Sequence, residues 1–127
     1  MRAPEPIEVV RIVATPAALD ATDWPDGLIA ARIAQDEILL MGGPPPEVPD
    51  PHALVEDDYG FSAVGLSTAD LEDVAKLCAW EYPKRPGVAQ GAVLGIPVRI
   101  VFPSDRSRDP ILLVSTTLAA GFREEFP

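Results

Sequence analysis

The fold is decided by Val88-Ala-Gln-Gly-Ala-Val-Leu-Gly-Ile-Pro-Val-Arg-Ile-Val101, in which two β-type runs flank a Leu94-Gly95 pair. A glycine-containing pair between two such runs predicts a tight hairpin. Pro97 cannot donate a ladder hydrogen bond, so we expect it at the first residue of its strand or on an edge. The second run has the alternation of a half-buried strand, with Arg99 and Val101 on its outward side. The inward side chains are Val98, Ile100 and Phe102.

The composition is that of a globular protein. The 127 residues, of which 47% are hydrophobic, suffice for one core, so we expect a single domain over residues 1–127. There are 20 acidic and 10 basic residues, and a net charge of −10 argues against nucleic-acid binding because phosphate backbones would repel the chain. The N-terminus lacks the apolar region of a signal peptide, and no uncharged apolar run approaches the roughly 20 residues of a membrane span. With Cys78 as the only cysteine, these features predict a cytoplasmic protein that does not bind membranes.

The first half of the chain, residues 1–43, predicts three strands and a short helix. Residues 7–13 are rich in β-branched side chains and favour a strand. The helix is expected at residues 16–21, with Thr15 as its N-cap and a proline at its first position. Two antiparallel strands are expected, at residues 28–34 and 37–41. The second is expected to be covered on both faces, because it contains a continuous apolar run.

Residues 44–59 differ in composition from the rest of the chain, because proline and acidic side chains dominate them. Proline-rich segments of this kind are extended and semi-rigid. We therefore interpret residues 44–59 as a surface connector between the first half and the second half, residues 60–127. Its acidic residues are Glu47, Asp50, Glu56, Asp57 and Asp58.

The second half predicts a strand over residues 61–66, then a helix, the 88–101 hairpin, another strand and a last helix. Ser67 is the expected N-cap of the first helix, and Asp70 completes a capping box with it. Ser115 is the expected cap of the last helix. Apolar stripes are expected on both helices: Leu71, Val74, Ala75, Leu77 and Cys78 on the first, and Leu118, Phe122 and Phe126 on the last.

This order of elements predicts an α+β fold. Hairpins with helices packed to one side of them are typical of a ferredoxin-like antiparallel sheet. The helices should then cover one face of that sheet.

Four segments, taken in order, carry a resemblance to a known family. Residues 61–78, Phe-Ser-Ala-Val-Gly-Leu-Ser-Thr-Ala-Asp-Leu-Glu-Asp-Val-Ala-Lys-Leu-Cys, resemble the strand-then-helix segment of the aminomethyltransferase family. Residues 86–99, Pro-Gly-Val-Ala-Gln-Gly-Ala-Val-Leu-Gly-Ile-Pro-Val-Arg, resemble the segment that follows in the gamma subunit of heterotetrameric sarcosine oxidase. Residues 34–42 resemble that family's acidic turn and apolar strand, and residues 109–122 resemble its closing strand and helix.

The resemblance implies an aminomethyltransferase-type, folate-binding fold and an accessory role. The chain would be a small, mainly structural subunit of a flavin- and folate-linked amine oxidase or demethylase complex. FAD, FMN, NAD and tetrahydrofolate would belong to larger partner subunits, and this chain alone would bind none of them. Two other functions stay open: a folate-binding one-carbon-transfer protein acting by itself, and a stand-alone regulatory domain.

The residues themselves predict no catalytic set and no metal site. Glu56, Asp57 and Asp58 lie near His52, but their spacing matches no established metal motif and favours a solvated surface. Cys78 lies on an apolar stripe and is expected to be a buried structural thiol. If the chain binds folate itself, Asp57 or Asp58 is the candidate carboxylate for a deep pocket.

Half of the basic residues fall between positions 84 and 108, opposite in sign to the acidic connector. Such residues are either solubilising charge or a contact surface that complements charged patches on other subunits. Aromatic and arginine side chains are enriched at interfaces, although the aromatic ones can equally cap a core. The candidate partner interface is Trp24, Trp80, Tyr82, Arg85, Arg99, Arg106 and Arg108.

Overall fold

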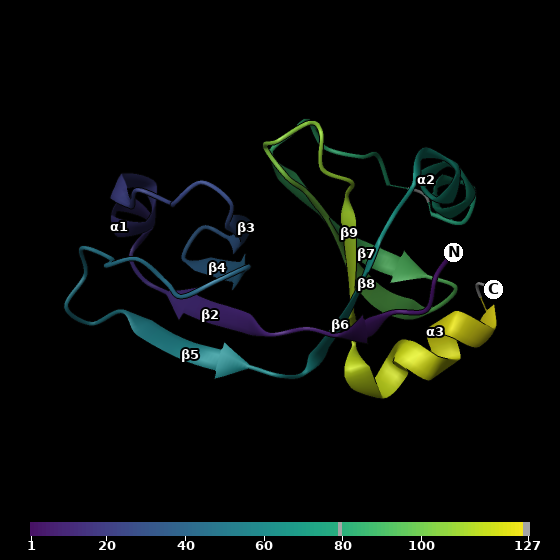
Figure 1. The fold of residues 1–127 in the computed structure, drawn as a ribbon, viewed down its shortest axis with the longest axis horizontal. Coiled ribbons are helices and arrows are strands. Elements are labelled where there is room, and N and C mark those ends of the chain that lie inside the picture. Colours follow the sequence, from purple (N-terminus) through teal and green to yellow (C-terminus); the bar gives the residue numbers. More distant parts are fainter. Residues whose placement is uncertain (79, 126–127) are drawn as a thin grey trace. The chain divides into compact units, whose positions relative to one another are not determined.

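The computed structural model describes residues 1–78 and 80–125, and the chain divides into two compact units. The larger unit comprises Met1–Ile7 and Gly60–Pro127, and the smaller unit comprises Glu8–Tyr59 (Figure 1). Each unit has its own antiparallel sheet, so the fold is α+β, as the sequence predicts. The structure has two antiparallel sheets where the sequence predicted one, and each unit buries a separate hydrophobic cluster.

The larger unit contains a five-stranded sheet in the order β1-β6-β9-β8-β7. Neighbouring strands are antiparallel throughout. Helix α2 (Thr68–Ala75) follows β6, and the 3-10 turn η1 (Thr116–Leu118) and helix α3 (Ala119–Glu125) follow β9. The strands are β1 (Glu5–Pro6), β6 (Phe61–Gly65), β7 (Gly87–Val93), β8 (Ile96–Phe102) and β9 (Ile111–Ser115).

Both helices of the larger unit cover one face of its sheet, as expected. Val74 from α2 and Phe122 from α3 are fully buried in the same hydrophobic cluster. Alternate residues of the strands supply the other half of that cluster, because side chains of period two point to one face. These include Val64, Ala89, Val98, Ile100, Phe102, Leu112 and Val114.

The smaller unit contains a four-stranded sheet in the order β3-β4-β2-β5, with helix α1 (Pro16–Ala21) packed on one face. Leu19 of α1 is buried against Ile12, Ile38 and Leu40. The strands are β2 (Val9–Val13), β3 (Ile29–Ala34), β4 (Glu37–Met41) and β5 (Leu54–Asp58).

The connector prediction is wrong for part of residues 44–59. Leu54–Asp58 form β5, which pairs antiparallel with β2. The whole segment lies inside the smaller unit and does not separate the two units. The carboxylate of Asp50 holds the preceding loop to the start of α1, because it accepts hydrogen bonds from the amides of Thr15, at 3.0 Å, and His52, at 2.9 Å. These two hydrogen bonds lower the pKa of Asp50.

The 88–101 hairpin is confirmed, with β7 and β8 joined at Leu94 and Gly95. Both turn residues have positive φ, 52° and 79°, which is the backbone of a type I′ turn. Pro97 is the second residue of β8 and lies beyond the pairing with β9, which begins at Val98. Val101 was expected to face outward, but it is only 2% exposed. It lies between its pairing partners Val88 and Ile111.

Replacing Leu94 with asparagine should stabilise the chain. Leucine in the left-handed region carries a steric cost that asparagine largely avoids, so we expect a gain of roughly 0.5–1 kcal/mol in the free energy of unfolding. Leu77→Asn is a suitable control, because Leu77 has a similar exposure of 42% and does not have positive φ. Urea denaturation measures both. A Leu94→Asn protein no more stable than wild type would contradict the strained turn.

The predicted caps of α1 and α2 are confirmed. The Thr15 hydroxyl accepts a hydrogen bond from the Ala18 amide, and Ser67 and Asp70 form the reciprocal capping box. Ser115 was expected to cap the last helix but makes no such side-chain hydrogen bond, because a 3-10 turn intervenes.

The predicted apolar stripes hold only in part. Ala75, the last residue of α2, and Leu77, beyond its end, are exposed, whereas Leu71 and Cys78 pack against the core cluster. On the last helix Phe122 is buried and Leu118 is 40% exposed. Phe126 lies outside the described residues.

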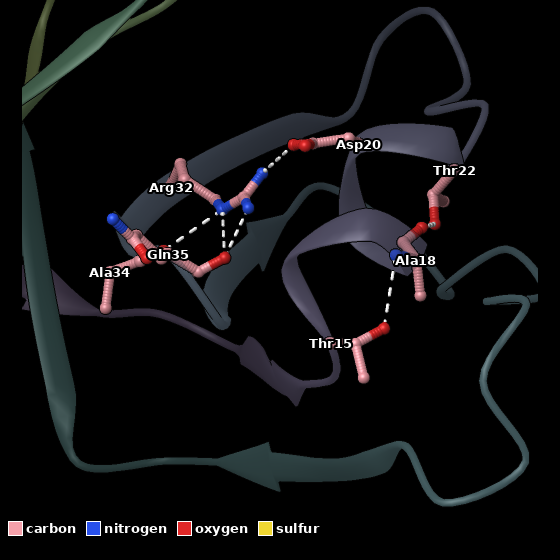
Figure 2. Close-up of polar contacts among 7 residues, drawn as sticks. All are labelled: Thr15, Ala18, Asp20, Thr22, Arg32, Ala34 and Gln35. Atoms are coloured by element: carbon pink, nitrogen blue, oxygen red, sulfur yellow. Dashed lines mark hydrogen bonds and ion pairs between the residues drawn. The ribbon is translucent and has the colours of Figure 1, made fainter.

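Polar side chains fasten α1 to the β3–β4 turn in the smaller unit (Figure 2). The Arg32 guanidinium pairs with Asp20 of α1 at 2.9 Å and donates to the carbonyl oxygens of Ala34 and Gln35. The pairing register shifts between Arg32 and Ala34, so this side chain stabilises an irregular point of the hairpin. Thr22 closes α1 by donating to the Ala18 carbonyl oxygen at 2.7 Å.

Candidate functional site

The predicted interface aromatic residues lie against the two hydrophobic cores. Trp24 is half-buried against the cluster of the smaller unit. Trp80 and Tyr82 pack on the cluster of the larger unit, where the Tyr82 ring lies 5.3 Å from that of Phe102. The Tyr82 hydroxyl donates to the Leu71 carbonyl oxygen at 2.7 Å, and burial raises the pKa of this phenol. These contacts favour the core-capping interpretation of the aromatic residues.

Arg85 stabilises a loop. Its Nη1 donates to the carbonyl oxygens of Pro103, Asp105 and Arg108 at 3.2, 3.1 and 2.9 Å. The Asp105 carboxylate accepts hydrogen bonds from the hydroxyl and amide of Ser107, and these lower the pKa of Asp105. Arg106 and Arg108 are exposed on this loop.

Arg99 lies on β8, apart in sequence from the loop arginines. Its Nε donates to Gln90 Oε1 at 2.9 Å, and its guanidinium carbon lies 5.8 Å from the centroid of the Phe61 ring. The structure therefore brings Arg85, Arg106 and Arg108 together at one loop and gives Arg99 a separate role on the sheet.

A polar hollow of about 430 Å³ lies in the larger unit at the start of α2. Arg2, Asp70, Asp109 and Arg123 contribute charges of both signs to its lining. Several charges are already paired: the terminal ammonium lies 3.8 Å from Asp70 Oδ1, and Arg123 Nη1 donates to the Met1 carbonyl oxygen at 2.6 Å. This mixture does not select one class of ligand.

Asp70 should make stability depend on pH. The Ser67 amide, chiefly, lowers the pKa of Asp70, so the ionised carboxylate stabilises the folded state above the unfolded pKa of about 3.9 and this contribution disappears as the pH falls through the folded pKa. We expect Asp70→Asn to be less stable than wild type at pH 7 and the difference to shrink on acidification. Thermal unfolding across pH measures this, with Glu72→Gln on the exposed face of α2 as the matched control. A difference that is constant with pH would contradict the capping role of the carboxylate.

The candidate acidic residues do not gather around His52. His52 is exposed in the loop before β5, and Glu56 pairs instead with Arg11. In the described part of the chain, no group of three or more His, Cys, Asp or Glu side chains is placed to hold a metal ion. Cys78 is half-buried, and its thiol donates to the Val74 carbonyl oxygen at 3.3 Å.

The most distinctive surface feature is β5, at the edge of the sheet of the smaller unit. Leu54, Val55 and the adjoining Tyr59 are 47%, 45% and 67% exposed. Asp57 is exposed as well, and Asp58 is half-buried on the same strand. The two candidate carboxylates for a folate site therefore both lie on an edge strand.

One arginine forms ion pairs with two acidic side chains on and near β5. Arg11, on β2, donates from Nε to Glu37 Oε2 and from Nη1 to Glu56 Oε1, both at 3.0 Å. The hydrogen bonds that Arg11 donates to Glu37 and then to Glu56 raise the pKa of Arg11. The pair with Glu56 links the edge strand to the centre of the sheet.

Asp57 and Tyr59 place a carboxylate and a phenol hydroxyl at the C-terminal end of β5. The Tyr59 hydroxyl donates to Asp57 Oδ2 at 3.4 Å, and the Asp57 charge, chiefly, raises the pKa of the phenol. Sequence reasoning placed Glu56, Asp57 and Asp58 at the surface but missed the strand, because aspartate is depleted in strands. The apolar Leu54-Val55 pair was the signal that could have indicated it.

Comparisons with family models, with curated proteins and with solved structures returned no match. Among residues 1–78 and 80–125, none of the helices combines the length and the apolar character of a membrane span.

Proposed function

We propose that this chain is a non-catalytic accessory subunit that binds a larger enzyme in the cytoplasm. The observation that carries this proposal is the edge strand β5, on and beside which Leu54, Val55 and Tyr59 are each exposed. Exposed apolar side chains on an open strand edge are a usual feature of protein–protein contacts, because both the side chains and the unpaired backbone gain from a partner.

The class of partner follows from the resemblance of residues 34–42, 61–78, 86–99 and 109–122 to the gamma subunit of heterotetrameric sarcosine oxidase. The chain would belong to a flavin- and folate-linked amine oxidase or demethylase. FAD, FMN, NAD and tetrahydrofolate would be held by the larger subunits. The antiparallel sheet of the larger unit, with helices on one face, would be its form of the ferredoxin-like part of the aminomethyltransferase-type fold.

An independent folate-binding function has less support. It needs a carboxylate in a deep pocket, and the candidates Asp57 and Asp58 lie on an edge strand. A stand-alone regulatory domain would need a ligand, and the mixed charges of the polar hollow select none.

The proposal is tested by isolating the chain with a tag from its source cells. We expect it to elute in gel filtration with a much larger chain, and the complex to show the visible absorption of a bound flavin. A chain that elutes only as a folded monomer, with no partner, would overturn the proposal. A colourless but stable complex would keep the accessory role and overturn the class of partner.

A further inference from the structure

The outer side of β5 has backbone groups that no neighbouring strand of its sheet can pair. β5 is the last strand in the order β3-β4-β2-β5, and its five residues pair with β2 on one side. In an antiparallel ladder, alternate residues direct their N–H and C=O groups to opposite sides. The outer side of β5 is therefore a template for a further strand.

The side chains of β5 present different chemistry on its two faces. Leu54 and Glu56 lie on one face, opposite Val13 and Arg11 of β2. Val55 and Asp57 lie on the other face, opposite Ile12 and Val10. Asp58 lies on the same face as Leu54 and Glu56, so an added strand would meet one exposed apolar side chain on each face, with two carboxylates on one face and one on the other. This gives a binding register as well as a charge preference.

The charges next to this edge are mainly negative. Glu56, Asp57 and Asp58 are consecutive, and the nearest cation across the strand, Arg11, is shared between Glu56 and Glu37. The raised pKa of Tyr59, caused chiefly by Asp57 and also by Glu8, is a second sign of negative potential here. A strand with lysine or arginine at alternate positions would face these carboxylates, whereas an acidic strand would be repelled.

We propose that β5 binds an extended, basic segment of a partner protein, which adds to the smaller unit as a fifth strand. This inference rests on the proposed accessory function and names the chemistry of the partner at the same surface. Acidic side chains on an edge strand can also serve only to keep sheet edges apart. A basic peptide of matching pattern distinguishes the two roles. It binds to β5 if the strand is a partner site, and it does not bind if the acidic side chains only keep sheet edges apart.

The test uses the full chain and three synthetic peptides. The probe alternates lysine with threonine; one comparison peptide has glutamate in place of lysine, and the other is the lysine peptide with alternate backbone amides methylated. We expect the lysine peptide to bind and to shift the amide resonances of residues 54–58, because it supplies both charge and strand pairing. The glutamate and methylated peptides should bind at least about tenfold more weakly, the latter because it cannot donate its ladder hydrogen bonds.

Two charge-reversal variants locate the site. Asp57→Lys should weaken binding of the lysine peptide by roughly three- to tenfold, since one attraction becomes a repulsion at an exposed surface. Asp26→Lys is the matched control, with the same change of charge at an exposed turn residue of the same unit, and should have a clearly smaller effect. The amide spectrum of each variant shows whether it is folded.

Three results would overturn the inference: no binding of the lysine peptide, equal binding of the methylated peptide, or resonance shifts confined to residues outside β5. None of them would by itself overturn the accessory function, which the isolation from source cells tests separately. Conversely, the lysine peptide could bind at β5 while the tagged chain is isolated from its cells without a partner. That pair of results would support strand addition at β5 and overturn the accessory role.

Discussion

Phe122→Ala should lower the free energy of unfolding by about 3–5 kcal/mol, the largest effect we expect from a single substitution. The Phe122 ring is fully buried and packs from α3 into the cluster that α2 and the sheet share. Removing it leaves a cavity in a cluster to which β6, β8 and β9 also contribute, and a close-packed core collapses only partly into such a space.

Leu118→Ala is the matched control for this change. Leu118 lies on the same closing segment, but it is 40% exposed and belongs to the preceding turn η1. We expect a loss of roughly 1 kcal/mol, since 40% of its surface is already in contact with water in the folded chain. Urea denaturation followed by circular dichroism measures both variants. Equal losses for the two would contradict the burial of Phe122.

Arg85→Met should cost about 2–3 kcal/mol, the second-largest effect. One guanidinium nitrogen serves three carbonyl oxygens, and methionine keeps the length of the side chain without donating to any of them. Pro103, one of the three acceptors, is itself buried, so its carbonyl oxygen loses a partner that water replaces poorly.

The control for Arg85 is Arg106→Met, which removes the same charge from an exposed position on the same loop. Its effect should stay within about 0.5 kcal/mol. Hydrogen exchange gives a second measurement, because the amides of residues 104–108 should exchange faster in Arg85→Met only. Arg106→Met could instead lower the free energy of unfolding as much as Arg85→Met does. The loss of a positive charge would then explain the effect, and the hydrogen bonds from Arg85 to the loop would not.

The parts of the fold that the sequence predicts well are those decided by neighbouring residues. The 88–101 hairpin follows from its glycine turn and period-two pattern, and the caps at Thr15 and Ser67 follow from hydroxyl side chains just before a helix. Each of these signals acts within a few residues. Long-range pairing is not required to read them.

The parts that were missed depend on residues far apart in the sequence. Leu54–Asp58 has an unfavourable composition for a strand, and its pairing with β2 includes the contact between Arg11 and Glu56, 45 positions apart. An edge position tolerates such a strand because one side and much of each face remain in water. The proline and acidic residues of the segment 44–59 therefore suggested a connector, although residues 54–58 form a strand.

The candidate interface shows the same division. Arg85 was predicted to contact a partner, but its three acceptors lie 18 to 23 positions away on a loop that sequence patterns do not bring to it. For Trp80 and Tyr82 the sequence allowed either a partner interface or a core-capping role, and their half-buried side chains pack against the core of their own unit. Three exposed apolar residues that lie close together in sequence, Leu54, Val55 and Tyr59, moved the candidate surface to β5.

Hydrogen–deuterium exchange of the chain, free and within the complex isolated from its source cells, tests the partner-binding role of β5 most directly. We predict that the amides of residues 54–58 exchange more slowly in the complex, whereas the exposed turn at residues 25–27 exchanges at the same rate in both states. Unchanged exchange at residues 54–58 in a stable complex would contradict the assignment of β5 as the binding surface.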